Sequence, residues 1–230
     1  MASSFCRFHE RYKNHFTTKT GNVIEQSRHY LFGLAQAIRK NIERMTEVVA
    51  GSEYQSVHHF ISNSPWDHRP IMDQVARDSD RLLGGSADSG LIIDETSIPK
   101  KGKKSVGVAR QWSGRLGKVD NCQVGVFASL VRGSSVAIID ERLYLPEEWT
   151  DDPERCRKAG VPGAVTFKTK SQLALELIRH ARSQGIRFAW LGVDGGYGKE
   201  PDFLSSLDAE SEQFVADVHK DQVIYLEDPA

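Results

Sequence analysis

The amino-acid sequence predicts an α/β fold in which a helical N-terminal domain precedes a mixed β-sheet. Apolar residues recur at three- and four-residue steps through residues 21–83, which is the period of amphipathic helices. After the linker Gly84-Gly85-Ser86, short apolar runs bounded by turn residues replace that period. The last part alternates between helical and extended patterns, as in sheets that contain parallel strands. We therefore expect a helical domain over residues 1–85 and an α/β domain over 86–230.

The helical pattern of the first domain divides into three segments. The first segment places these apolar residues on one face: Val23, Leu31, Leu34, Ala35, Ile38, Ile42 and Met45. The second segment begins at Ser52-Glu53 and ends at Ser64-Pro65. Asp67 favours the N-cap position of the third segment, which carries Ile71 and Leu82.

The second domain is predicted to open with a β meander. Its strands are expected at residues 90–94, 123–131 and 136–145, with a hairpin turn at Arg132-Gly133-Ser134. The elements that follow are a helix over 169–185, a buried strand over 188–194, a short helix over 201–207 and a strand over 213–218. Three strands in a meander followed by alternating helices and strands favour a mixed sheet.

Composition excludes several classes of protein. Of the 230 residues, 39% are hydrophobic and 27% are charged, which is typical of a soluble globular protein. Cys6, Cys122 and Cys156 are odd in number and form no C-x-x-C pair, so neither a disulfide framework nor a zinc site is expected. No apolar run approaches the roughly 18 residues of a membrane span, and no signal peptide follows Met1. We expect a cytoplasmic protein without a membrane partner.

Two aspartates follow apolar runs and are candidate metal ligands. Asp94 follows Leu91-Ile92-Ile93, and Asp194 follows the run over 188–193 and precedes a glycine-rich turn. Cleavage of a phosphodiester with paired magnesium ions needs carboxylates from different elements that meet at one point. The alternative for each aspartate is an ordinary capping or turn residue.

A basic stretch begins directly after the first aspartate. Its candidate DNA-binding residues are Lys100, Lys101, Lys103, Lys104, Arg110, Arg115 and Lys118. Such a cluster beside an acid predicts contact with the phosphates of a polyanion, although a solvated lysine loop is the alternative. Trp112 and Tyr197 are candidates for stacking on bases, against the alternative that each packs within its own domain.

Other motifs are not supported. Thr96 stands where an aspartyl-phosphate phosphatase would carry its second aspartate, and the turn Gly195-Gly196-Tyr197-Gly198 lacks the spacing of phosphate loops. That turn is expected to provide conformational freedom beside Asp194. His58-His59 is expected to be an ordinary histidine pair, because adjacent helical residues point about 100° apart. The segment 149–155 is expected to have a structural role, with an acidic N-cap and a first-turn proline.

Long strings of the chain resemble one family. The resemblance is carried by residues 91–111, from Leu91-Ile92-Ile93-Asp94-Glu95 to Arg110-Gln111, by residues 117–126, and by Arg142-Leu143-Tyr144-Leu145-Pro146 with its continuation to Arg155. These strings are similar to bacterial insertion-sequence transposases of the DDE class, and the similarity extends from about Val23 to Val218. Strings of this length are far more specific than a single acidic motif.

The resemblance implies an RNase H-like catalytic domain. Its sheet would bring Asp94, as the first acid, and Asp194, as the second, around two ions of Mg²⁺ or Mn²⁺. In such enzymes the metals activate water and then the freed 3′-hydroxyl for attack on phosphodiesters, which gives DNA cleavage and strand transfer. The implied partners are the DNA of the element ends and of the target, with a homodimer on DNA as a further expectation. The N-terminal helices would recognise the element ends.

The family's third acid has no match in this chain. It is commonly a glutamate in the motif Y-x-x-R-x-x-x-E-x-x-x-x-x-x-K, and nothing after Asp194 fits that motif. Glu210, Glu212 and Glu227 lie in or beside a short predicted helix and strand, where that glutamate is not expected. We therefore expect a transposase that is truncated before its third catalytic acid. The alternatives are a non-catalytic DNA-binding remnant and a metal-dependent nuclease that a partner chain completes.

Overall fold

The structure is a computed structural model in which residues 2–19 and 21–222 are described. The chain divides into two compact units, Met1–Gln74 and Val75–Ala230. The division falls inside helix α5 (Arg69–Leu83), ahead of the glycine linker at which the sequence pattern changes. Ala76 and Leu83 of this helix join the hydrophobic core of the second unit, so the end of α5 belongs to that unit.

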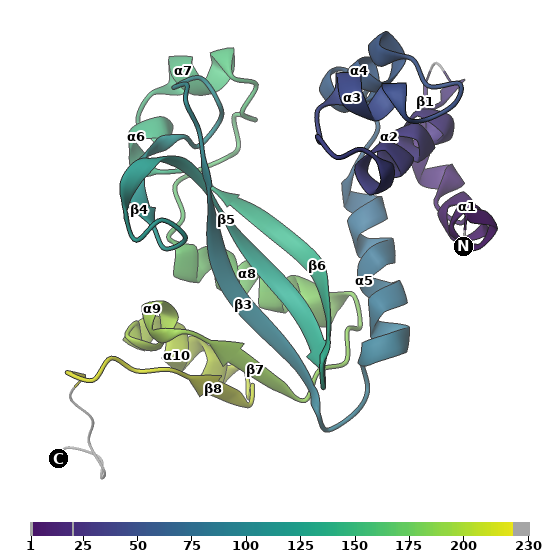
Figure 1. The fold of residues 1–230 in the computed structure, drawn as a ribbon. Helices are drawn as coiled ribbons and strands as arrows, with labels where there is room; N and C mark the ends of the chain where they lie inside the picture. The colour runs from purple at the N-terminus through teal and green to yellow at the C-terminus, as the bar shows by residue number, and fades with distance from the viewer. Residues whose placement is uncertain (1, 20, 223–230) are drawn as a thin grey trace, which may run out of the picture. The chain divides into compact units, whose positions relative to one another are not determined.

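The N-terminal unit consists mainly of short helices (Figure 1). Before α5 its elements are α1 (Ala2–Glu10), the 3-10 helix η1 (Lys13–Phe16), β1 (Thr17–Thr18), β2 (Gly21–Asn22), α2 (Ile24–Gln36), α3 (Ile42–Glu47) and α4 (Tyr54–Ser62). Phe16 and Phe60 are buried, and the rings of Phe60 and Trp66 stack with their centroids 5.1 Å apart. This aromatic cluster links η1 to α4 and to the segment before α5.

The first predicted helix is interrupted. α2 ends before Ala37, which has an extended backbone (φ −71°, ψ 138°), and α3 begins after Asn41, whose side chain accepts a hydrogen bond from the backbone N–H of Arg44 at 2.9 Å. Met45 is buried as the apolar period indicated, but Ile38 is 99% exposed. The expectation for Ile38 was wrong because the extended backbone breaks the helical spacing that would have turned it inward.

The second unit contains a six-stranded sheet. Its strands are β3 (Ser89–Pro99), β4 (Ala109–Ser113), β5 (Lys118–Arg132), β6 (Ser135–Tyr144), β7 (Trp190–Val193) and β8 (Phe214–Ala216). Its helices after α5 are α6 (Glu147–Thr150), α7 (Pro153–Lys158), α8 (Lys170–Ser183), α9 (Gly195–Gly198) and α10 (Pro201–Ala209). No helix within the described ranges is both long enough and apolar enough to cross a bilayer.

The sheet is mixed, and β3 lies in its middle. β3 pairs antiparallel with β5 and parallel with β7. β5 also pairs antiparallel with β6, and β8 runs parallel to β7. A meander of three strands followed by two parallel strands is the expected RNase H-like arrangement, so the predicted fold class is confirmed. β4, which pairs with the first residues of β5, was not predicted.

β3 is longer than its apolar run indicated. The prediction ended this strand at Asp94, but the strand continues to Pro99 because the long β5 pairs with it from Ser89↔Arg132 to Pro99↔Cys122. Asp94 therefore lies within a strand and not at its end. Asp194 does directly follow its strand, β7, as the sequence predicted.

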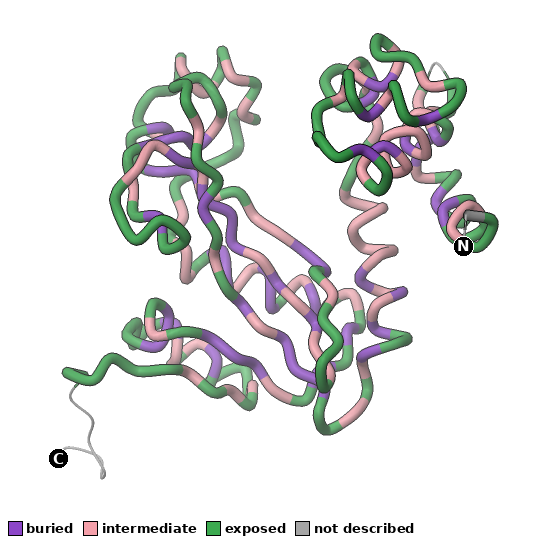
Figure 2. The backbone as a smooth tube through the Cα atoms, viewed as in Figure 1, coloured by how far each residue is buried: buried purple, intermediate pink, exposed green. Residues whose placement is uncertain are grey.

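The hydrophobic core lies between one face of the sheet and helix α8 (Figure 2). α8 begins with a capping box, in which Thr169 and Gln172 satisfy each other's backbone N–H groups. Its buried residues are Leu173, Ala174, Leu177, Ile178 and Ala181, and they belong to the same cluster as Leu91, Ile93, Val126, Ala128, Leu191 and Val193 of the strands. Side chains alternate along a strand, so Asp94, next to Ile93, points to the opposite face.

Candidate metal centre and nucleic-acid interface

Asp94 on β3 and Asp194 at the end of the neighbouring parallel strand β7 line the same pocket. The register between β3 and β7 pairs Ile93 with Val193; Asp94 is the next residue of β3, and Asp194 is the first residue after β7. Neighbouring strands are about 4.8 Å apart, so one cation has room to bind both carboxylates. Both aspartates line a pocket of about 370 Å³. The fold therefore brings together the two acids that the sequence singled out.

The electrostatics of this pair favour a cation. Partial burial raises the pKa of the Asp94 carboxyl group, and the negative charges of Asp194 and Glu95 raise it further, whereas a hydrogen bond from the backbone N–H of Glu95 lowers it. A divalent ion bound between the two groups would offset the negative charges that disfavour ionisation of Asp94. Oxygen donors of this kind suit Mg²⁺ and Mn²⁺.

Each aspartate is oriented by one of its carboxylate oxygens. Oδ1 of Asp94 accepts the backbone N–H of Glu95 at 2.7 Å, and Oδ1 of Asp194 accepts the backbone N–H of Gly196 at 2.9 Å and so caps α9. No hydrogen bond within the described part of the chain reaches the second oxygen of either group. Those two oxygens are the atoms available to a metal ion.

The glycines after Asp194 serve a different purpose from the expected one. None of the glycines at 195, 196 and 198 has a positive φ, so conformational freedom is not what the turn needs. A Cβ on Gly198 would lie 1.9 Å from the carbonyl oxygen of Asp217. The turn therefore needs glycine for the close approach of α9 to the chain after β8.

A hydrogen-bonded cluster is centred on Glu95, which lines the same pocket as the two aspartates. Glu95 accepts a hydrogen bond from the Tyr197 hydroxyl at 3.1 Å, and the ammonium group of Lys170 at the start of α8 binds its other oxygen. Burial and the charge of Glu95 raise the pKa of the Tyr197 phenol. The sequence left two roles open for Tyr197, stacking on bases and packing within its own domain; Tyr197 is only 2% exposed, so it packs within its domain.

The candidate DNA-binding residues are spread over three pockets. Arg115 lines the aspartates' pocket together with Trp112, which is 58% exposed. Lys103 and Arg110 line a second pocket of about 500 Å³, and Lys103 and Lys104 line a third. The remaining candidates are Lys118, which forms an ion pair with Asp120 at 3.1 Å, and Lys100 and Lys101, which line none of these pockets. Only Arg115 is brought to the two acids.

The basic loop between β3 and β4 is held by side chains of β5, which sequence reasoning missed. The Asn121 amide donates to the carbonyl oxygens of Lys100 and Gly102 at 2.6 and 3.0 Å. The Gln123 amide donates to the carbonyl oxygen of Val106 at 2.6 Å. These anchors hold the loop backbone in place, which argues against a loosely solvated loop. The sequence signal that could have indicated these anchors is the pair of amide residues Asn121 and Gln123, two positions apart in β5.

Glu95 lines the pocket of the pair, but its two oxygens are bound by Lys170 and Tyr197. Within the described residues, no group of three or more histidine, cysteine or acidic side chains is arranged to hold a metal. Glu210 and Glu212 form ion pairs with Arg179 and Arg182 of α8, and neither lines the aspartates' pocket. Glu227 lies outside the described residues.

Comparison with known proteins places the chain in a family. Residues 12–230 match the model of the DDE superfamily endonucleases. A probable transposase for insertion sequence element IS701 from Microchaete diplosiphon is 29% identical over 190 residues, which cover 82% of this chain and 47% of that protein. The chain thus spans about half the length of this curated relative.

A solved structure, the Drosophila P element transposase strand transfer complex, aligns at 12% sequence identity. The alignment covers 91% of this chain and 47% of that chain, but its TM-score of 0.26 is too low to establish a shared fold. The family match covers nearly the whole chain, and the chain belongs to the DDE superfamily endonucleases.

Proposed function

We propose that this chain belongs to an insertion-sequence transposase, which cleaves DNA strands and joins them to a target, and that it supplies two aspartates of the metal centre. The observation that carries the proposal is that Asp94 and Asp194 each follow one member of the pair Ile93↔Val193 of β3 and β7, and that both line one pocket. Family membership and the likeness to a probable insertion-sequence transposase support it.

The free oxygens of Asp94 and Asp194 would hold Mg²⁺ or Mn²⁺. When bound, such ions polarise the phosphate and lower the pKa of the attacking hydroxyl group. The chain's own part is to fix both carboxylates through the backbone N–H groups of Glu95 and Gly196, and to place Arg115 beside them as a phosphate contact. Because a carboxylate pair leaves each ion's shell incomplete, a third acid from outside the described residues would complete the centre.

The proposal is tested by metal binding. Calorimetric titration of Mn²⁺ into the chain is expected to detect a site that Asp94→Asn and Asp194→Asn each weaken by at least tenfold. Both variants keep an oxygen for the observed backbone hydrogen bond, so their folds should persist. Asp208→Asn removes an exposed carboxylate on α10 outside the pocket and serves as the matched control. Equal Mn²⁺ affinity in all four proteins would overturn the proposal.

DNA cleavage separates the transposase from its alternatives. The chain is incubated with DNA that carries element ends in Mg²⁺ or Mn²⁺, and we expect binding with little cutting. Cutting that Asp94→Asn abolishes would instead identify a nuclease complete in this chain or between two copies of it. DNA binding without any Mn²⁺ site would leave a non-catalytic binding remnant. Light scattering of the complex measures whether two copies occupy one DNA.

A further inference from the structure

The segment after β6 forms a second, small core that is separate from the main one. Val108, Leu145 and Trp149 are buried together in it. The indole N–H of Trp149 donates to the carbonyl oxygen of Val108 at 2.8 Å, which ties α6 to the loop after β3. The guanidinium of Arg155 lies 3.7 Å from the centroid of the Trp149 ring. Asp152 caps α7 and Pro153 opens it, as the sequence predicted. This core holds α7 against the basic loop.

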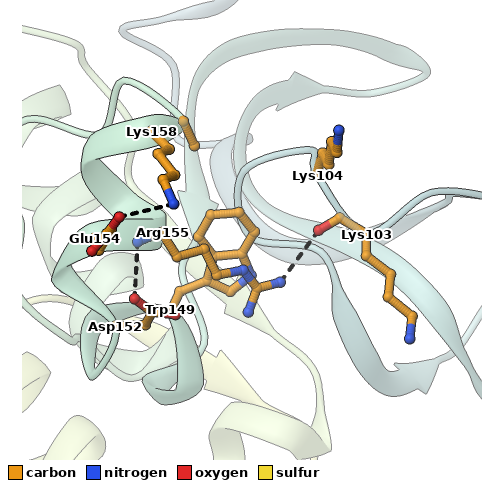
Figure 3. Close-up of a pocket in the computed structure, with 8 residues that line it drawn as sticks. Lys103, Lys104, Trp149, Asp152, Glu154, Arg155 and Lys158 are labelled. Atoms are coloured by element: carbon orange, nitrogen blue, oxygen red, sulfur yellow. Dashed lines mark hydrogen bonds and ion pairs between the residues drawn. The ribbon is translucent and has the colours of Figure 1, made fainter.

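A pocket of about 740 Å³ opens between the basic loop and α7 (Figure 3). Lys103 and Lys104 line it from the loop, and Arg155 and Lys158 line it from α7. Arg155 also donates to the carbonyl oxygen of Lys103 at 3.4 Å, so the two walls are linked. Cations from segments about fifty positions apart in the sequence therefore meet around one cavity.

The two acids of the pocket are already engaged. Asp152 accepts the backbone N–H of Arg155 at 2.9 Å as the helix cap. Glu154 forms an ion pair with Lys158 at 2.8 Å. Four cationic side chains thus face two carboxylates, and the pocket carries a net positive charge. The exposed side chain of Lys158, at 68%, can turn from Glu154 toward a ligand.

We propose that this pocket is a binding subsite for the phosphodiester backbone of DNA, at which Lys104, Lys158 and Arg155 contact phosphate. The guanidinium stacked on Trp149 is held by the carbonyl oxygens of Lys103 and Val108, both at 3.4 Å, and by an ion pair with Glu148 at 3.6 Å. These contacts are long, so its N–H donors can turn to phosphate oxygens, which a guanidinium matches in geometry. The open shape and the mostly charged lining suit a strand that passes through and not an enclosed small molecule. The subsite rests on the proposed action on DNA and extends it beyond the two aspartates.

A line of basic side chains connects the subsite to the aspartates' pocket. Lys103 and Arg155 also line the 500 Å³ pocket, which adds Arg110 of β4. Arg110 and Trp112 are two positions apart on β4 and so point to the same side of that strand. Trp112 lines the pocket of the two aspartates. A DNA strand that follows these contacts would run from α7 past β4 to the metal centre.

The test measures how the anisotropy of labelled duplex DNA depends on salt for the full chain. Lys158→Gln is expected to weaken binding by about three- to tenfold and to lower the slope of log K against log[salt] by about one, because one phosphate contact is lost. Arg157→Gln is the matched control. It removes the same charge from the same helix, but Arg157 is 76% exposed and does not line the pocket. We expect less than a twofold change for this variant.

Three further measurements identify the origin of the effect. Glu154→Gln releases Lys158 and should strengthen binding by about twofold or more, whereas weaker binding would overturn the subsite. Equal losses in Lys158→Gln and Arg157→Gln would also overturn it, since they would show only a general effect of charge. Competition by inorganic phosphate at millimolar concentration, as strong as that by DNA, would assign the pocket to small anions instead. Mn²⁺ binding at Asp94 and Asp194 should be unchanged in Lys158→Gln, so failure of the subsite leaves the proposed function intact.

Discussion

The hydroxyl group of Tyr197 donates a hydrogen bond to Oε2 of Glu95 across 3.1 Å, and this contact joins the two strand segments that carry the aspartates. Glu95 is the next residue after Asp94, and Tyr197 lies in the helix that Asp194 caps. The same carboxylate binds Lys170 at the start of α8. Glu95 therefore ties β3 to α9 and to α8 beside the two aspartates, within the pocket that all three acids line.

Tyr197→Phe should weaken metal binding although Tyr197 is not a proposed metal ligand. The lost hydrogen bond to a charged, partly buried group should cost about 2 kcal/mol of unfolding free energy. We also expect Mn²⁺ to bind several-fold more weakly, measured by titration at a temperature where the variant is folded. Tyr144→Phe is the control, because it removes a phenol hydroxyl for which no hydrogen bond is described, from a ring that lies 5.8 Å from the Lys170 ammonium. Unchanged Mn²⁺ affinity in Tyr197→Phe would contradict the positioning role.

Gly198→Ala should destabilise the turn that follows Asp194. The new Cβ would meet the carbonyl oxygen of Asp217, so α9 or the chain after β8 must move. We expect a loss of about 1–3 kcal/mol, the usual range for overpacking, in urea unfolding. Gly163→Ala is the control, because a Cβ there meets no atom within 4 Å. Equal stability of the two variants would show that the turn relaxes freely.

The stability of the N-terminal unit should fall in mild acid. Burial and the charge of Arg28 lower the pKa of His9 from its usual value of 6.5, and its ring nitrogen is hydrogen-bonded to Ser27 Oγ at 3.1 Å. The unfolded chain therefore binds a proton that the folded chain excludes, so stability is complete above about pH 6.5 and declines as the pH falls below it. Thermal melting at pH 7.5 and pH 5.5 measures this decline. His9→Gln should reduce the pH dependence, and His59→Gln, at an exposed site, should leave it intact.

Trp112 should report on unpaired bases at the metal centre. Its ring is 58% exposed in a pocket that contains both aspartates, and stacking on one base contributes about 1–3 kcal/mol. Trp112→Ala should weaken binding of single-stranded DNA by about tenfold and remove most of the quenching of tryptophan fluorescence. Leu116→Ala, at a neighbouring exposed apolar residue, should do neither. Quenching that persists in Trp112→Ala would place the bases elsewhere.

Much of the fold could be predicted from local patterns. The meander, the helix α8 and the aspartate after β7 were all predicted, because alternation and helical periodicity are properties of short segments. The interruption at Ile38 and the continuation of β3 past Asp94 were not. Each depends on what the segment packs against, and the length of β3 is set by its pairing with β5.

The amino-acid sequence by itself determined that Asp94 and Asp194 are the candidate metal ligands and that a basic run follows β3, because acidity and charge are properties of single residues. Tertiary structure alone decided which of these residues meet. Parallel pairing of β3 with β7 brings residues a hundred positions apart to one point, and the second core around Trp149 gathers cations from the basic loop and α7. Such contacts arise from the register of distant strands and the packing of separate segments, which no local sequence pattern encodes.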